Sequence, residues 1–97
     1  MLDKNANLEN LYKIGTGWVF DTENNKGYIV KRERTSRGYY NGRVIDFIPA
    51  FELQKTADGK YNSRIMLTVP AGVLRKAVEM AQLKEKGNLE ARKRRYR

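Results

Sequence analysis

Residues 61–81 have the sequence YNSRIMLTVPAGVLRKAVEMA, and the spacing of their apolar side chains changes at Pro70. Before Pro70, apolar and polar residues alternate, which predicts a strand over residues 61–69. After Pro70, apolar residues recur at intervals of three and four, which predicts a helix that ends near Lys86 with Gly87 beyond it. Proline suits the first position of a helix, because the N–H that it lacks would have no partner there. The stretch therefore predicts a strand that leads directly into a helix.

Three more strands are predicted before this unit. Residues 17–21, 28–35 and 43–55 are rich in β-branched and aromatic residues, and turn signals built from Asn, Asp and Gly separate them. Pro49 lies inside the third of these strands, so a bulge, a bend or a sheet edge is expected there. The short connections favour an antiparallel arrangement. The expected fold is therefore α+β, a four-stranded antiparallel meander followed by one C-terminal α-helix.

Alternation along the strands predicts which side chains share a face. Without a bulge, one face of the third strand holds Arg43, Ile45, Phe47, Pro49, Phe51 and Leu53, and one face of the fourth holds Tyr61, Ser63, Ile65, Leu67 and Val69. In the second strand, one face holds Tyr28, Val30, Arg32 and Arg34, and the other holds Ile29, Lys31, Glu33 and Thr35. The apolar sets of the last two strands are expected to form a core that the helix covers, since no other element is available for that role.

The chain of 97 residues is expected to hold one domain. Residues 1–10 are predicted to be a flexible N-terminus or a short helical turn, residues 11–87 the domain, and residues 88–97 a basic tail. Without Cys and His, the sequence offers no disulfide, no thiolate or imidazole metal ligand and no histidine base. Its carboxylates are scattered and its glycines form no phosphate-binding loop, so we expect no enzyme, no cofactor and no metal. Nothing resembles a signal peptide or membrane span, which favours the cytoplasm of a bacterium or an infected cell.

The charge balance points toward a polyanionic partner. Lys and Arg number 20 against 11 Asp and Glu, which gives a net charge of +9. Such an excess is typical of nucleic-acid binders, although a solvated basic surface, a ribosomal protein or a membrane-surface protein would share it. Five of the 20 cations lie in the tail, as Arg92, Lys93, Arg94, Arg95 and Arg97. The tail would attract phosphate without reading sequence, or it is a disordered solubility tail.

The remaining cations alternate with aromatic residues, a pattern that suits single-stranded nucleic acid because cations follow phosphates and rings stack on unpaired bases. The candidate rings are Trp18, Tyr28, Tyr39, Tyr40 and Tyr61. The candidate cations are Lys31, Arg32, Arg34, Arg37, Arg43, Lys60 and Arg64. Trp18 and Tyr28 are equally suited to ordinary core packing. Binding is favoured for Tyr39 and Tyr40, because the loop around them is polar and offers little core to fill.

Residues 26–86 resemble the positive cofactor four family of transcriptional coactivators, relatives of the Whirly proteins. The resemblance lies in residues 42–52, GRVIDFIPAFE, in the turn and strand of residues 58–67, DGKYNSRIML, and in a helix that directly follows that strand. It implies a curved sheet and two channels for single-stranded DNA, with Lys31, Arg32, Arg34, Arg43, Lys60, Tyr61 and Arg64 carried over to the channel. It also implies a homodimer formed largely through the helices, which here would use Val73, Leu74, Ala77, Met80 and Ala81. Ile48 departs from the family, which usually has an arginine there.

Three functions are consistent with these observations. The first is a non-catalytic single-stranded DNA-binding protein of a phage, plasmid or bacterium, largely independent of sequence, that acts in replication, recombination or transcription. The second is a regulator that binds duplex DNA or RNA mainly through the tail. The third is a protein-interaction module, such as a phage inhibitor that docks on an acidic host protein. No membrane partner is expected.

Overall fold

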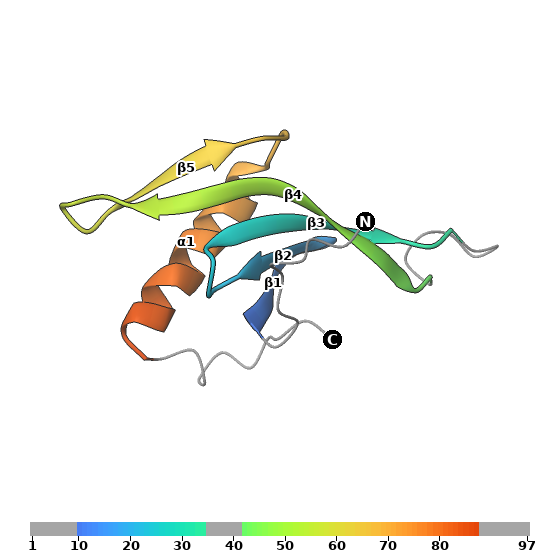
Figure 1. Cartoon of the computed structure of the whole chain (residues 1–97), viewed down its shortest axis with the longest axis horizontal. Coiled ribbons are helices and arrows are strands. Elements are labelled where there is room, and N and C mark those ends of the chain that lie inside the picture. Colours follow the sequence, from blue (N-terminus) through green and yellow to red (C-terminus); the bar gives the residue numbers. More distant parts are fainter. Residues whose placement is uncertain (1–9, 35–41, 88–97) are drawn as a thin grey trace.

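The computed structural model describes residues 10–34 and 42–87. Five strands form one antiparallel sheet in the order of the sequence, and a single helix follows them (Figure 1). The elements are β1 (Leu11–Gly15), β2 (Trp18–Asp21), β3 (Lys26–Arg32), β4 (Val44–Lys55), β5 (Tyr61–Ile65) and α1 (Ala71–Glu85). The prediction of an α+β fold with an antiparallel meander and a C-terminal helix is confirmed, whereas the predicted number of four strands is wrong.

The strand that the sequence pattern missed is β1. It pairs with β2 through Leu11 and Asp21 at one end and Lys13 and Val19 further along, with an irregularity before Gly15. Leu11, Tyr12 and Ile14 are all buried, so the apolar residues of β1 face both sides of the sheet. A strand buried on both faces does not alternate between apolar and polar residues, which removes the pattern by which a half-buried strand is recognised.

The turn between β2 and β3 is built around a buried carboxylate. Asp21 is fully buried, and its Oδ1 accepts the N–H groups of Glu23 at 2.9 Å and Asn24 at 3.2 Å. Its Oδ2 accepts Nδ2 of Asn24 at 2.9 Å. Asn25 then takes a φ of 55°, a left-handed conformation that Asn tolerates better than most residues. These bonds supply partners for the turn backbone and set the start of the long β3–β4 hairpin.

An irregularity in β4 places Phe47 and Phe51, which lie on either side of Pro49 in the sequence, on opposite faces of the sheet. Gly27 pairs with Phe51 while the next residue, Tyr28, pairs with Pro49, so β4 carries one extra residue at Ala50. The prediction of a bulge, bend or edge at Pro49 is thereby confirmed. The extra residue shifts the alternation, so Phe47 and Phe51 lie on opposite faces. The predicted common face from Arg43 to Leu53 is therefore wrong.

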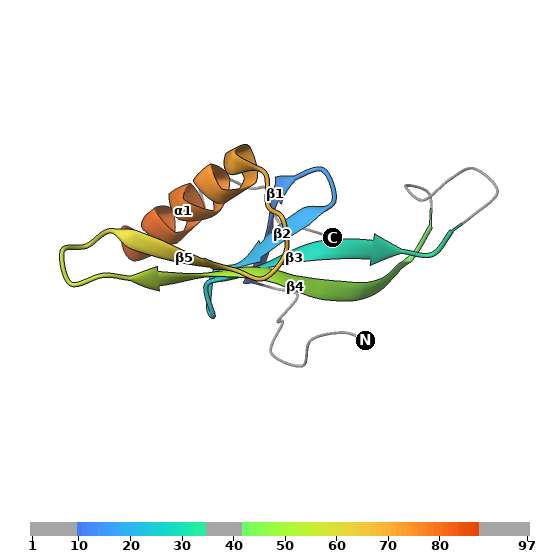
Figure 2. The ribbon, with the colours of Figure 1, turned by 90° about the horizontal axis from the view of Figure 1, so that it is seen from above.

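Buried apolar residues form one cluster on each face of the sheet. The helix-side cluster lies between the sheet and α1, which Figure 2 shows on one side of the strands, and it consists of Tyr12, Ile14, Phe20, Ala50, Phe51, Leu53, Val73, Ala77, Met80 and Ala81. The far-side cluster consists of Leu11, Val19, Tyr28 and Phe47. In the helix-side cluster, the rings of Phe20 and Phe51 stack with centroids 6.1 Å apart. The core is thus richer on the helix side but is not confined to it.

Helix α1 begins one residue later than the sequence predicted. Pro70 is its N-cap, with a φ of −59° and a ψ of 142°. At the other end Gly87 takes a φ of 71°, and its N–H donates to the carbonyl oxygen of Lys84 at 3.0 Å. The predicted stop at Gly87 is confirmed, because only a residue without a Cβ adopts this left-handed conformation at little cost.

The apolar stripe of α1 packs inside the chain. Val73, Ala77, Met80 and Ala81 are 0–7% exposed and belong to the helix-side cluster, and Leu74 is half-buried against it. Side chains already covered by their own sheet have little apolar surface left for a second copy. The predicted dimer interface through Val73, Leu74, Ala77, Met80 and Ala81 is therefore not supported, because the intrachain core uses these residues. In residues 10–34 and 42–87, no helix is long and apolar enough to cross a membrane.

Candidate nucleic-acid interface

Strands β3 and β4 form a two-stranded ribbon that extends beyond the rest of the sheet (Figures 1 and 2). Their pairing continues to Arg32 and Val44, and the N–H of Glu33 then donates to the carbonyl oxygen of Arg43 at 2.7 Å. This ribbon brings together four of the predicted cations, Lys31, Arg32, Arg34 and Arg43. We call these four residues the basic end.

The cations of the basic end project from both faces of the ribbon. Lys31 follows the alternation of Ile29, which packs on the helix-side cluster, whereas Arg32 follows Tyr28 and Val30 of the far-side cluster. Lys31 is exposed. Arg32 is half-buried, and its Nη1 donates to the carbonyl oxygen of Gly42 at 3.0 Å. Arg32 thus helps to hold the two chain segments together at this end of the ribbon, while Lys31 presents its charge to solvent.

Two carboxylates offset part of this charge. Nε of Arg43 lies 3.3 Å from Oε2 of Glu33, with 84% and 48% of the two side chains exposed. Asp46 lies opposite Lys31 in the register. An ion pair this exposed contributes little free energy, because water screens the attraction. Arg43 can therefore exchange Glu33 for a phosphate at small cost.

The other predicted site residues of the described sheet lie away from the basic end. Lys60 and Tyr61 follow the opposite end of β4, a strand of 12 residues and so about 40 Å long. Arg64 is exposed on β5, where it pairs in register with Glu52. The predicted channel that combines these three residues with the basic end is not formed as one contiguous cluster, because β4 separates them.

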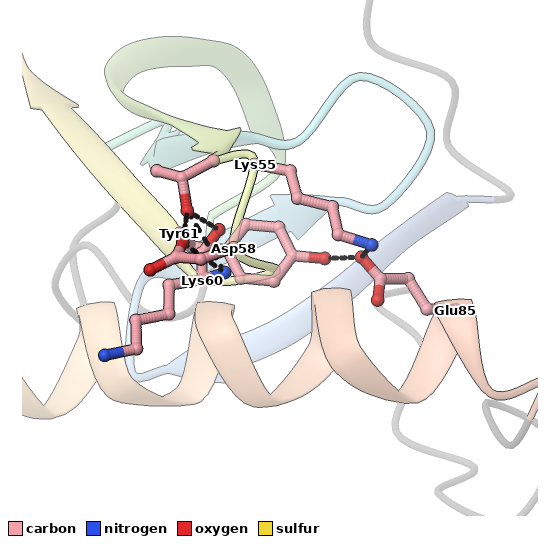
Figure 3. Close-up of polar contacts among 6 residues, drawn as sticks. Lys55, Asp58, Lys60, Tyr61 and Glu85 are labelled. Atoms are coloured by element: carbon pink, nitrogen blue, oxygen red, sulfur yellow. Dashed lines mark hydrogen bonds and ion pairs between the residues drawn. The ribbon is translucent and has the colours of Figure 1, made fainter.

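Tyr61 connects the β4–β5 hairpin to the end of α1 (Figure 3). Its hydroxyl donates to Oε1 of Glu85, which also lies 3.1 Å from Nζ of Lys55. Burial raises the pKa of Tyr61 to about 12, and the hydrogen bond and charge of Glu85 add to the shift. The hydrogen bond from Tyr61, and then that from Lys55, lowers the pKa of Glu85. The Tyr61 ring therefore has a structural role at this position.

The turn before Tyr61 is held by its own side chains, also drawn in Figure 3. Thr56 donates its hydroxyl to Oδ1 of Asp58, and the same hydroxyl oxygen accepts the N–H of Lys60 at 3.2 Å. Gly59 takes a φ of 84° between them. Lys60 is exposed at the end of this turn, where it is remote from the basic end.

Two of the predicted stacking rings take part in packing. Tyr28 is fully buried, with its ring edge-on to Phe47 at a centroid distance of 6.3 Å. The prediction that Tyr28 stacks on a base is therefore wrong, since neither ring face is accessible. Trp18 is half-buried beside the helix-side cluster, 6.5 Å from the ring of Phe51. Sequence reasoning had left core packing open for both residues.

The remaining predicted residues lie outside the described ranges. They are Arg37, Tyr39 and Tyr40, in the segment that links the two strands of the basic end, and Arg92, Lys93, Arg94 and Arg95 of the tail. Within residues 10–34 and 42–87, no three acidic side chains are grouped to hold a metal ion. Comparisons of the chain with protein-family models, with curated proteins and with solved structures gave no match.

Sequence reasoning missed one exposed feature. Ile65 and Leu67 were predicted to join the helix-covered core, but they are 47% and 41% exposed, and Met66 between them is 43% exposed. Strand β5 ends at Ile65, so the predicted alternation does not continue to Val69. The signal that would have found this surface is three consecutive large apolar residues, which a half-buried strand does not need.

Proposed function

We propose that this chain is a non-catalytic protein that binds single-stranded DNA, largely independently of sequence, in replication, recombination or transcription. The basic end is the surface that we assign to the phosphates. The observation that supports it best is the extension of β3 and β4 beyond the sheet, which places Lys31, Arg32, Arg34 and Arg43 on one narrow ribbon. For binding a flexible polyanion, a narrow cationic ribbon that is accessible from both faces is better suited than a rigid protein surface.

Preference for single strands rests on a small number of rings. Within the described residues, Tyr28 is buried, Trp18 packs beside Phe51, and the hydroxyl of Tyr61 is bonded to Glu85. The sequence adds Tyr39 and Tyr40 between the strands of the basic end, together with Arg37. We therefore assign base stacking to Tyr39 and Tyr40.

The test is a titration of fluorescently labelled single-stranded and duplex oligonucleotides at low and moderate salt. Each phosphate contact with a single strand contributes about −0.7 to the slope of log K against log salt, so four contacts predict a loss of about 50-fold between about 50 and 200 mM salt. Tighter binding of single strands with this salt dependence supports the proposal. Affinity that does not change with salt contradicts it.

A second function, binding of duplex DNA or RNA through the tail, is favoured by the charge distribution. Glu33 and Asp46 offset part of the basic end, whereas the tail holds five cations against one carboxylate, a net +4 of the total +9. Deletion of residues 88–97 separates the two functions. A small loss of single-strand affinity supports the basic end, and a loss of most affinity for both probes supports the tail.

A further inference from the structure

Strand β5 ends in the largest run of exposed apolar residues in the described chain. The large apolar side chains exposed there and elsewhere in residues 10–34 and 42–87 are Ile45, Ile65, Met66 and Leu67. Three of the four are consecutive: Ile65 is the last residue of the edge strand β5, and Met66 and Leu67 come directly after it. Single exposed apolar residues are ordinary, but a contiguous group indicates an interaction surface.

The outer edge of β5 has no paired strand within residues 10–34 and 42–87. In the described part of the chain β5 pairs only with β4, and four of its five residues are exposed. The N–H of Thr56 donates to the carbonyl oxygen of Lys60 at 2.8 Å, and the N–H of Met66 donates to that of Ala50, also at 2.8 Å. In an antiparallel strand, the backbone N–H and C=O groups of every second residue bond to the same neighbouring strand, so those of Asn62 and Arg64 point toward β4. The N–H and C=O groups of the alternate residues Tyr61, Ser63 and Ile65 therefore point outward.

The opposite edge of the sheet is protected in ways that β5 is not. Strand β1 is irregular between Lys13 and Gly15, and α1 packs against it so closely that a Cβ on Gly15 would lie 3.1 Å from Val73. Strand β5 has regular register with β4 along its whole length, contains no proline, and has Arg64 as its one charged residue. Natural sheets usually protect an exposed edge with such features, so β5 is the edge that accepts an additional strand.

We propose that β5 pairs with β5 of a second copy of this chain, antiparallel, about a two-fold axis at Ser63. The outward groups fix this register, because Ser63 then pairs with Ser63 of the partner subunit while Tyr61 and Ile65 pair with each other across the axis. All three outward residues of each strand are used, which gives about six backbone hydrogen bonds between the chains. No other symmetric register uses all of them.

The side chains of β5 are compatible with this pairing. Tyr61 comes to lie beside Ile65, an aromatic and β-branched pair that is favourable across strands. Arg64, the one charged residue of β5, comes opposite Asn62, so like charges do not meet directly. Met66 and Leu67 follow at each end and lose exposure against the other copy. A closed two-fold arrangement of this kind does not propagate into fibres.

The arrangement makes one continuous sheet from two chains. The two-fold axis of an antiparallel strand pair is perpendicular to the sheet, so both copies of α1 lie on the same face. The two basic ends point in opposite directions along the strands. The inference goes beyond nucleic-acid binding and holds whether or not the chain binds DNA.

The test is the molar mass of the full-length chain, measured by light scattering over a dilution series. We expect twice the chain mass of 11.3 kDa for the natural sequence. Ser63→Lys places two like charges at the axis and should give the single-chain mass, as should Ser63→Glu. Gln54→Lys adds the same charge at an exposed position of β4, away from the edge, and should leave the dimer unchanged.

A mixture of the Ser63→Lys and Ser63→Glu chains provides a second measurement, because opposite charges then meet at the axis. We expect the mixture to recover the double mass, which a folding defect in either chain would prevent. A single-chain mass for the natural sequence at every concentration overturns the proposal. A dimer that Ser63→Lys and Ser63→Glu leave intact also overturns it, since the chains would then associate through another surface.

Discussion

Gly27 is the position where one added methyl group tests the register of the sheet. It pairs with Phe51, and a Cβ at Gly27 would lie 2.0 Å from Cε1 and 2.1 Å from Cζ of that ring. Phe51 is fully buried and stacks on Phe20 with a centroid distance of 6.1 Å, so its ring has no space into which to move. Gly27→Ala is therefore expected to force a rearrangement of the helix-side cluster.

The expected loss follows from this overlap. Overfilling a packed core costs typically 1–3 kcal/mol, and a methyl group well inside contact distance belongs at the upper end, about 3 kcal/mol. Alanine gains back at most about 1 kcal/mol, because it loses less backbone entropy on folding than glycine. A net 2–3 kcal/mol corresponds to a fall in Tm of roughly 8–24 °C for a domain of this size. Urea unfolding monitored by circular dichroism measures the free energy directly.

Two further variants make this prediction specific. Gly72→Ala changes a helical glycine with no atom within 4 Å of the new Cβ, so it should raise the free energy of unfolding by about 0.5–1 kcal/mol. Phe51→Leu removes the ring that the methyl group added by Gly27→Ala would overlap, so the double variant should be more stable than the sum of the single effects predicts, by about 1–2 kcal/mol. Gly27→Ala with natural stability would refute the register, and with it the extra residue at Ala50.

Three other changes test separate parts of the structure. Met80→Ala should reduce the free energy of unfolding by about 2–4 kcal/mol, because Met80 is 2% exposed. It should leave the molar mass of the native protein unchanged. A changed molar mass would instead support the predicted dimer interface through α1. Spectroscopic titration should give Tyr61 a pKa of about 12, which Glu85→Gln lowers toward 10.0. Since that pKa is raised in the folded chain, the contribution of protonated Tyr61 to the free energy of unfolding is complete below pH 10 and is lost as the pH rises toward 12. A Tyr61 pKa that Glu85→Gln leaves unchanged would contradict the role of Glu85. Tyr39→Ala combined with Tyr40→Ala should weaken single-strand binding by about 1–3 kcal/mol per ring with little effect on duplex binding, and equal losses with both probes would exclude stacking.

The sequence predicted the elements with a single regular period and failed where two faces are buried or a register shifts. Helix α1 was predicted with its end at Gly87, because one apolar stripe and one left-handed glycine define it. Strand β1 was missed, because Leu11 and Tyr12 face opposite sides of the sheet and are both buried. The bulge at Pro49 was expected, but its position at Ala50 and its effect on Phe47 depend on which residue of β3 each residue of β4 meets.

The candidate site was predictable in composition but not in arrangement. Alternation correctly separated Ile29 from Tyr28 and Val30, and its extension to Lys31 and Arg32 stays a prediction. The predicted strand over residues 43–55 already placed Lys60 at the far end from Arg43, so it was the family resemblance that wrongly joined them in one channel. The sequence did not indicate that Tyr28 would be fully buried. It also placed Ile65 under the helix. Helix α1 packs mainly over β1 and β2, a tertiary choice that no local pattern encodes, and this leaves the end of β5 exposed.

The basic end is tested most directly by the salt dependence of single-strand binding in two matched double variants. Lys31→Gln with Arg34→Gln removes two cations from the basic end, whereas Arg75→Gln with Lys76→Gln removes the same charge from the exposed surface of α1. Two lost phosphate contacts should make the slope of log K against log salt shallower by about 1.4 in the first variant, and the second should keep nearly the natural slope. Equal slopes in both variants would contradict the assignment of the phosphates to the β3–β4 ribbon.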